Sequence, residues 1–194
     1  MCHKLQTYPL HWVGFLYNIS QNNICQNLLT ITEKYDNIAD LLKNPNLTIY
    51  KSLVNFKNDG YYQFVHTFYR DCSYNSDYSF LITPLIDKIK PLSLIKIKAN
   101  LTVGTKELIE YPLHYDLISL KENIPLPFVK NAAYYVNTNN GYTHFENNEK
   151  IDSIANRIVI FDNDILHGST NCTDENCRLV ININYISKHF GIEK

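Results

Sequence analysis

Hydrophobic and polar residues alternate along two segments in the second half of the chain. In residues 93–101 the apolar row is Ile95, Ile97, Ala99 and Leu101, and the polar row is Lys96, Lys98 and Asn100. In residues 178–186 the apolar row is Leu179, Ile181, Ile183 and Tyr185, and the opposite row is Arg178, Val180, Asn182 and Asn184. Because successive side chains of a strand point to opposite faces, both segments are predicted to be strands with one face in the core.

Four further segments of this half are short, rich in aromatic and β-branched residues, and separated by turns. They cover residues 113–120, 131–137, 142–146 and 157–162. Several short strands at nearly regular spacing favour a sandwich or a jelly roll.

The first half is predicted to contain both strands and helices. Residues 8–17 and 60–69 are aromatic and β-prone, whereas Ser20 can cap a helix that ends before Asp36. A second helix is predicted over residues 78–90, where Leu81, Leu85 and Ile89 recur every four residues. These helices would brace one sheet from outside. We therefore expect a single domain of the mainly β (α+β) class over residues 1–194, with supporting elements in 1–91 and the jelly-roll core in 92–187.

Charge and cysteine content limit the class of protein. The 18 basic side chains nearly balance the 19 acidic ones, and no basic run offers a surface for nucleic acid. The five cysteines are odd in number and irregularly placed, which argues against a disulfide framework. No apolar leader or membrane-length segment is visible. These features predict a soluble cytoplasmic protein without a membrane partner.

The residues most indicative of chemistry are His114 and Asp116 in YPLHYD, followed by a lone histidine, His167. On an extended strand, residues two apart project from the same side and can hold one metal ion together. Two histidines and one carboxylate on one face of an octahedron leave positions open for a cosubstrate and O2, which is typical of non-haem Fe(II) sites. An H-x-D triplet alone is a weak signal, so the other segments matter.

Arg178 adds to this interpretation because it lies within a strand and has apolar neighbours. Burying an arginine is costly unless it meets an anion. A carboxylate held by the guanidinium fork would offset that cost.

Four ordered segments together resemble the Fe(II)/2-oxoglutarate-dependent oxygenase superfamily, specifically its prolyl-4-hydroxylase-like branch and small phage and bacterial relatives. The segments are YPLHYD, YYVNTNNGYTHFE, NRIVIFDNDILHGS and CRLVININY, within residues 92–187. The resemblance implies a double-stranded β-helix with iron at one mouth. It also implies an enzyme that uses Fe(II), 2-oxoglutarate and O2 to hydroxylate a peptide side chain or a small metabolite.

The same resemblance assigns roles to individual residues. His114, Asp116 and His167 match the iron ligands. Arg178 and Thr143 match residues that hold the distal carboxylate of 2-oxoglutarate.

Two further positions match the pattern less closely. Asn100 could contact the cosubstrate, although the stretch TVGTKELIE after Leu101 makes its spacing ambiguous. Tyr111 matches an aromatic position that lines the substrate side.

The chain also departs from the family pattern. Asn140 and Asn156 stand where the family has glycine, which is tolerable because asparagine enters the left-handed region more easily than most residues. Arg178 replaces the lysine of animal and plant prolyl hydroxylases, which puts a peptidyl-proline substrate in doubt.

Two other functions stay open at this point. One is a non-catalytic jelly-roll binding module that has reused the cavity, against which the intact set of four site residues argues. The other is a nucleobase-modifying oxygenase, against which the absence of a basic, aromatic stripe argues.

Several conspicuous residues are expected to be structural. Strand alternation directs His144 away from Thr143, which favours a surface position, and His66 has no acidic or thiol partner at ligand spacing. Cys172 and Cys177 flank a short loop without a second cluster that would complete a zinc site.

Overall fold

Two antiparallel sheets make up most of the structure, a computed structural model that describes residues 6–7, 47–50, 63–119 and 121–187. The predicted strand 8–17, the predicted helix after Ser20 and the histidines at positions 3, 11 and 189 lie outside the described residues. The elements are β1 (Gln6–Thr7), β2 (Leu47–Tyr50), β3 (Gln63–Arg70), β4 (Ser73–Tyr74), the 3-10 helix η2 (Ser79–Ile82), α3 (Thr83–Ile89), β5 (Ser93–Val103), β6 (Val129–Tyr135), β7 (Tyr142–Phe145), β8 (Lys150–Asp152), β9 (Arg157–Asp162), β10 (His167–Ser169) and β11 (Cys177–Ile186).

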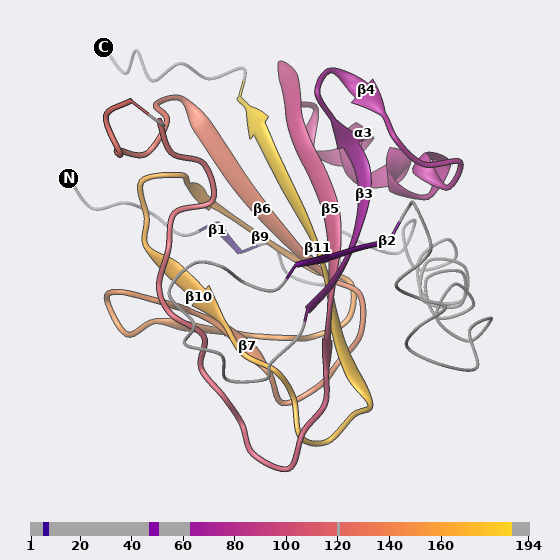
Figure 1. Cartoon of the computed structure of the whole chain (residues 1–194), viewed down its shortest axis with the longest axis vertical. Helices are drawn as coiled ribbons and strands as arrows, with labels where there is room; N and C mark the ends of the chain where they lie inside the picture. Colours follow the sequence, from indigo (N-terminus) through magenta and orange to yellow (C-terminus); the bar gives the residue numbers. More distant parts are fainter. Residues whose placement is uncertain (1–5, 8–46, 51–62, 120, 188–194) are drawn as a thin grey trace.

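The larger sheet has the strand order β1-β9-β6-β11-β5-β3-β2, and β4 pairs with β3 (Figure 1). The smaller sheet has the order β10-β7-β8. The chain passes from one sheet to the other between β6 and β7, β8 and β9, β9 and β10, and β10 and β11, as in a jelly roll. Consecutive strands are direct neighbours at β2-β3, β3-β4 and β7-β8. The larger sheet also takes in β1, β2 and β3, so it extends beyond residues 92–187.

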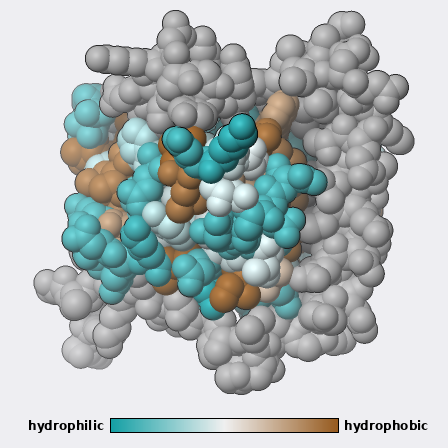
Figure 2. Space-filling view, turned by 90° about the horizontal axis from the view of Figure 1, so that it is seen from below, coloured by the Kyte–Doolittle hydropathy of each residue, from teal (hydrophilic) through white to brown (hydrophobic). Residues whose placement is uncertain are grey.

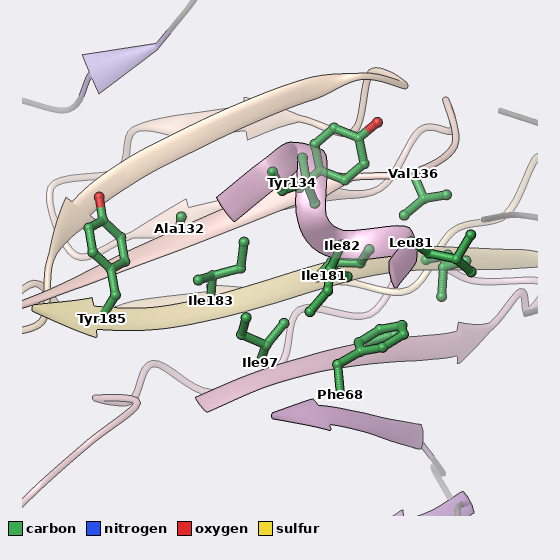
Figure 3. Packing of buried hydrophobic residues seen from close by; sticks show 13 residues of the cluster. Phe68, Leu81, Ile82, Ile97, Ala132, Tyr134, Val136, Ile181, Ile183 and Tyr185 are labelled. Carbon is green, nitrogen blue, oxygen red and sulfur yellow. The ribbon is translucent and has the colours of Figure 1, made fainter. Parts of the chain in front are cut away.

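One face of the larger sheet packs under the helical segment. The predicted apolar row of β11 lies on this face, together with Ile97 of β5 and Ala132 of β6. From η2 and α3, Leu81, Ile82 and Leu85 pack against these residues, and all three are buried. Figure 3 shows Leu81 and Ile82 beside the sheet. The expectation that a helix braces one sheet from outside is confirmed for the helix at 78–90.

The opposite face of the larger sheet turns toward the smaller sheet. The residues buried between the two sheets are Ala133, Tyr135, Phe145, Val159, Phe161, Ile165 and Val180. The polar row of β11 belongs to this inner face, so the alternation predicted for 178–186 is confirmed. It directs the side chain of Arg178 toward the space between the two sheets.

The predicted helix at 78–90 forms as η2 followed by α3. The backbone N–H of Lys90 donates to the carbonyl of Ile86 at 2.8 Å, and Lys90 has the left-handed φ of 50° that often ends a helix. Pro91 follows directly and cannot continue the helix.

Two sequence predictions about strands need correction. Between Lys96 and Leu94 the pairing of β5 with β11 shifts by one residue at a bulge. Leu94, and not Ile95, therefore packs against the core. Residues 113–119 form no strand but only isolated bridges at His114 and Ile118, because Pro112 and Pro125 interrupt regular pairing around them.

Hydrophobic and hydrophilic side chains are interspersed on the end of the molecule seen in Figure 2, as is common on protein surfaces. Among the helices of the described segments, none has the length and apolar character that a bilayer crossing requires.

The packing of β11 predicts a large effect of truncating its apolar row. Ile181 is fully buried beneath the helical segment, so Ile181→Ala should lower the free energy of unfolding by about 2 to 5 kcal/mol through lost burial and the cavity left behind. Chemical denaturation monitored by circular dichroism measures this loss. Ile124→Ala, at a side chain that is 51% exposed, is the control and should change stability little. Equal losses in the two variants would contradict the assigned core.

Candidate metal centre

His114 and His167 are brought together by their backbones. The N–H of His114 donates to the carbonyl of His167 at 2.9 Å, and the N–H of His167 donates back at 3.2 Å. Directly opposed residues of an antiparallel bridge project their side chains to the same face. The two imidazole centroids are accordingly 4.8 Å apart.

Asp116 completes the group. Its Oδ1 lies 3.6 Å from Nε2 of His114 and 3.7 Å from Nε2 of His167. The three ligand atoms all lie within 4.8 Å of one another. A metal ion about 2.1 Å from each atom would hold them roughly 3 Å apart in an octahedral arrangement, so the two distances from Asp116 would each shorten by roughly 0.6 to 0.7 Å.

The second ring nitrogen of each histidine fixes which nitrogen faces the metal position. Nδ1 of His114 lies 3.1 Å from the carbonyl of Pro112, and Nδ1 of His167 lies 3.2 Å from the carbonyl of Ile165. Because a carbonyl can only accept, both rings must carry the proton on Nδ1. Each Nε2 is then left with a lone pair for a metal ion.

The charges of the group keep the carboxylate of Asp116 ionised, which is the form that binds metal. Burial raises the pKa of Asp116, but its interactions with His114 and His167 outweigh burial and hold that pKa well below its usual range. Burial lowers the pKa of His114, whereas Asp116 raises it and prevails. The carboxylate is therefore ionised, and a dication would take the place of the protons that it attracts.

A chain of buried asparagines orients Asp116. Nδ2 of Asn184 donates to Oδ2 of Asp116 and to Oδ1 of Asn131, both at 2.9 Å. Asn184 is 2% exposed and Asn131 is 1% exposed. With Oδ2 engaged, Oδ1 is the atom that faces both histidines, which favours one-oxygen coordination of a metal ion.

The same chain ties the loop of Asp116 to the sheet. Nδ2 of Asn131 donates to Oδ1 of Asn163 at 3.4 Å, and Nδ2 of Asn163 donates to the carbonyls of Leu117 and Leu126 at 2.7 and 3.2 Å. Asn163 also accepts from the backbone N–H of Leu117 at 3.2 Å. These contacts replace the strand pairing that residues 113–119 lack.

Arg178 lines the same cavity as the three candidate ligands. It is 3% exposed, and its Nε donates to Oγ of Ser153 at 2.7 Å. None of the ion pairs of the described residues involves Arg178. Desolvation lowers its pKa, yet a guanidinium stays charged, so the cavity contains a buried cation without a carboxylate partner.

Thr143 lies beside Arg178, and its hydroxyl hydrogen is available to donate to a ligand. Its Oγ1 accepts from Nη2 of Arg178 at 3.3 Å and from the hydroxyl of Tyr135 at 2.8 Å. A hydroxyl has two lone pairs and one hydrogen, so these two contacts leave the O–H available as a donor. Arg178 and Thr143 together present donors suited to a carboxylate.

Gly141, in the predicted turn, makes room for Arg178. A Cβ at this position would lie 2.4 Å from the carbonyl oxygen of Asn171 and 2.6 Å from Cδ of Arg178. Any larger residue would therefore displace the arginine.

The two asparagines at family glycine positions behave differently. Asn156 has a φ of 66°, as predicted for a residue that replaces glycine. Asn140 is not among the described residues with positive φ, so the replacement of glycine is tolerated there without a left-handed backbone. Its side chain instead bonds Thr173, with Oδ1 accepting from the Thr173 N–H at 2.9 Å.

The remaining predicted residues lie around the cavity. Asn100 lines it, and its buried Oδ1 has no hydrogen-bond partner. Rotating this amide by 180° would present its NH2 group instead, an orientation that suits an anion. Tyr111 is half-buried and is not among the described residues that line the cavity; its carbonyl oxygen lies 3.0 Å from Nε2 of His144. Nε2 of His66 lies 2.8 Å from Oγ of Ser76, away from the candidate ligands.

No protein-family model matches the sequence, and no curated protein matches it either. Solved structures do match. A prolyl-4-hydroxylase of Pseudomonas putida aligns with a TM-score of 0.53 at 10% identity, over 96% of this chain and 94% of that one. The epimerase SnoN, in complex with Fe3+, α-ketoglutarate and nogalamycin RO, gives 0.59 at 14% identity over 95% of this chain and 79% of that one. AviO1 from Streptomyces viridochromogenes Tue57 gives 0.53 at 11% identity over 96% and 90%.

The chain has the fold of prolyl-4-hydroxylase and SnoN. The expectation of a mainly β jelly roll is confirmed by this likeness and by the two sheets. With so few identical residues, the likeness extends to the fold, and the chemistry is argued from the side chains.

Sequence reasoning missed four residues that shape the site: Asn131, Asn163, Asn184 and Ser153. Asn184 carried a detectable signal, because it belongs to the polar row of β11 that also contains Arg178. The other three have no regular spacing relative to the ligands, and only the tertiary structure brings them near.

The hydrogen bond between Asn184 and Asp116 predicts a role in metal affinity. Asn184→Leu keeps the side-chain volume but leaves Oδ2 of Asp116 without its donor, so Mn(II) affinity should fall by about 10- to 100-fold. Isothermal titration calorimetry measures the change. Asn182→Leu is the matched control on the same row of β11. A variant at Asn184 that binds Mn(II) like the parent would show that this asparagine only packs.

Proposed function

We propose that this chain is an Fe(II)- and 2-oxoglutarate-dependent dioxygenase that hydroxylates a C–H bond of a peptide side chain or a small metabolite. In this reaction one atom of O2 enters the substrate as a hydroxyl group. The other enters succinate, and 2-oxoglutarate loses CO2. His114, Asp116 and His167 would hold Fe(II), which supplies the activation of O2 when 2-oxoglutarate is bound.

The observation that carries this proposal is Arg178, which has no carboxylate partner among the described residues and lies in the cavity that contains the three candidate ligands. A metal-binding triad alone would suit many hydrolytic or structural sites. A buried guanidinium beside a free hydroxyl hydrogen on Thr143 requires an anion. 2-Oxoglutarate has a chelating keto-acid end for the metal and a second carboxylate for Arg178.

The protein residues would contribute binding and geometry. Arg178 and Thr143 would hold the distal carboxylate, and Asn100 would donate to the cosubstrate after its amide is turned. The chain of asparagines would keep Asp116 in place as the metal binds. Phe161, whose ring centroid lies 4.7 Å from that of His167, excludes water from one side of the metal position.

The structural neighbours agree with either substrate class. One is a prolyl-4-hydroxylase, and SnoN was solved with α-ketoglutarate, which is 2-oxoglutarate, and with nogalamycin RO, a small molecule. Arg178 stands where animal and plant prolyl hydroxylases have lysine, so a substrate other than peptidyl-proline is favoured here.

Substitution of Arg178 tests the cosubstrate. Arg178→Ala should leave Mn(II) affinity nearly intact but weaken 2-oxoglutarate binding by about 2 to 5 kcal/mol, roughly thirtyfold to several-thousandfold, because a charge-assisted pair is lost in a desolvated cavity. Arg178→Lys should recover part of this affinity, since it keeps the charge and loses the fork. Calorimetric titration of the Mn(II)-loaded protein with 2-oxoglutarate measures each value.

Arg157→Ala is the control, because Arg157 lies on β9 and its Nη1 donates to the carbonyl of Asp152 at 3.2 Å. If Arg178→Ala bound 2-oxoglutarate like the parent, Arg178 would be a structural arginine. The non-catalytic binding module would then be the better account of the cavity.

A further inference from the structure

Lys98 is a second cation in the wall of the candidate cavity. It lies on β5, two residues before Asn100 and on the same face, and it lines the cavity together with His114 and Asp116. Its side chain is half-buried.

Lys98 lies in a row of hydrogen-bonding side chains that crosses three strands. Its register partner on β3 is Thr67, and its partner on β11 is Asn182, which also lines the cavity. Directly paired residues of neighbouring strands present their side chains on one face. The row therefore offers an ammonium, a hydroxyl and an amide to the same region.

No carboxylate neutralises Lys98 in the part of the chain that the structure describes. None of the ion pairs there includes it, and Asp116 is the sole acidic residue among the described residues that line the cavity. Lys98 is close enough to affect the metal ligands. Against the effect of burial, which raises it, the pKa of Asp116 is lowered by both histidines and also by the positive charge of Lys98.

Loading the cavity would leave Lys98 without a counterion. Fe(II) with Asp116 carries one net positive charge, and Arg178 adds a second. The two negative charges of 2-oxoglutarate neutralise these two, so the positive charge of Lys98 remains. A partly desolvated charge of this kind favours an anionic partner.

We infer that the primary substrate carries an anionic group, a carboxylate or a phosphate, that pairs with Lys98 in the row Thr67–Lys98–Asn182. The inference rests on the proposed function, since it assigns the substrate of that same cavity. Substrates with an acidic group near the carbon to be hydroxylated would be oriented by this pair, and neutral analogues of the same shape would bind more weakly.

The carboxylate next to the keto group of 2-oxoglutarate is the other anion that could pair with Lys98. It would contact Lys98 if the keto-acid end lay against β5. In that case loss of Lys98 would weaken cosubstrate binding, whereas a substrate subsite would leave cosubstrate affinity unchanged. Measuring both affinities in one variant separates these two sources.

Acetate and acetamide make a matched pair of probes, because they have nearly the same shape and differ in charge. Each is titrated into the Mn(II)-loaded protein saturated with 2-oxoglutarate, and binding is followed by calorimetry or by enhancement of water-proton relaxation. Acetate should bind at least about tenfold more tightly than acetamide, and Lys98→Met should remove this preference. Lys98→Arg should retain it. Lys106→Met, at an exposed loop lysine, is the control and should behave like the parent.

Equal binding of the two probes, or an unchanged acetate preference in Lys98→Met, would overturn the inference. A loss of 2-oxoglutarate affinity in Lys98→Met as large as that in Arg178→Ala would overturn it in favour of the cosubstrate. Retained Mn(II) binding shows that the variant is folded. Failure of the proposed function is distinguishable, because the parent protein would then not bind 2-oxoglutarate, whereas the difference in acetate preference between the parent and Lys98→Met can be measured without it.

Discussion

The pair of backbone hydrogen bonds between His114 and His167 is the constraint on which the rest of the site depends. It joins a loop without regular strand pairing to the edge of the smaller sheet, and it opposes two histidines that are 53 positions apart in the chain. Once these backbones are paired, both imidazoles must project to one side. Asp116, two residues further, then needs only to be held, and Asn184 does so from the larger sheet.

The inner face of the larger sheet carries buried polar side chains beside its apolar cluster, and these supply the donors that the arrangement needs. Asn131, Asn184 and Arg178 are each at most 3% exposed, and burying such groups is costly unless each has a partner. The asparagines have protein partners throughout. Arg178 has hydroxyl partners, and within the described segments no carboxylate pairs with it, so its charge suits an anionic ligand. Stability on the outer face, where the apolar row of β11 packs under the helix, offsets the cost of the polar inner face.

The sequence predicted those parts of the fold in which apolar and polar residues alternate regularly. Alternation placed Leu179 and Arg178 on opposite faces. One face of this strand packs in an apolar core and the other faces a polar cavity, so apolar and polar residues alternate along it. The bulge at Ile95 was not predictable, since the alternation of residues runs through it unchanged. The segment around His114 was wrongly predicted as a strand, because a period of two also fits a loop that touches the sheet at single bridges.

The candidate site could be assembled from the sequence only as far as residue types and spacing allow. His114, Asp116, His167 and Arg178 have chemistry that is conspicuous in an apolar context, and the structure brings all four to one cavity. Asn163 and Ser153 are ordinary loop residues in the sequence. Their contributions arise from the crossing connections between the two sheets, which no local pattern records.

The central claim is that one cavity holds Fe(II) and 2-oxoglutarate together, and the most direct test is the visible spectrum of the Fe(II)-loaded protein without O2. Addition of 2-oxoglutarate should produce a weak metal-to-ligand charge-transfer band, because chelation by the keto acid places an electron acceptor on the metal. The band should be absent in Asp116→Ala, which removes the one anionic ligand and should lose iron. A parent protein that binds Fe(II) but gives no band, or an Asp116→Ala protein that gives the full band, would contradict the account.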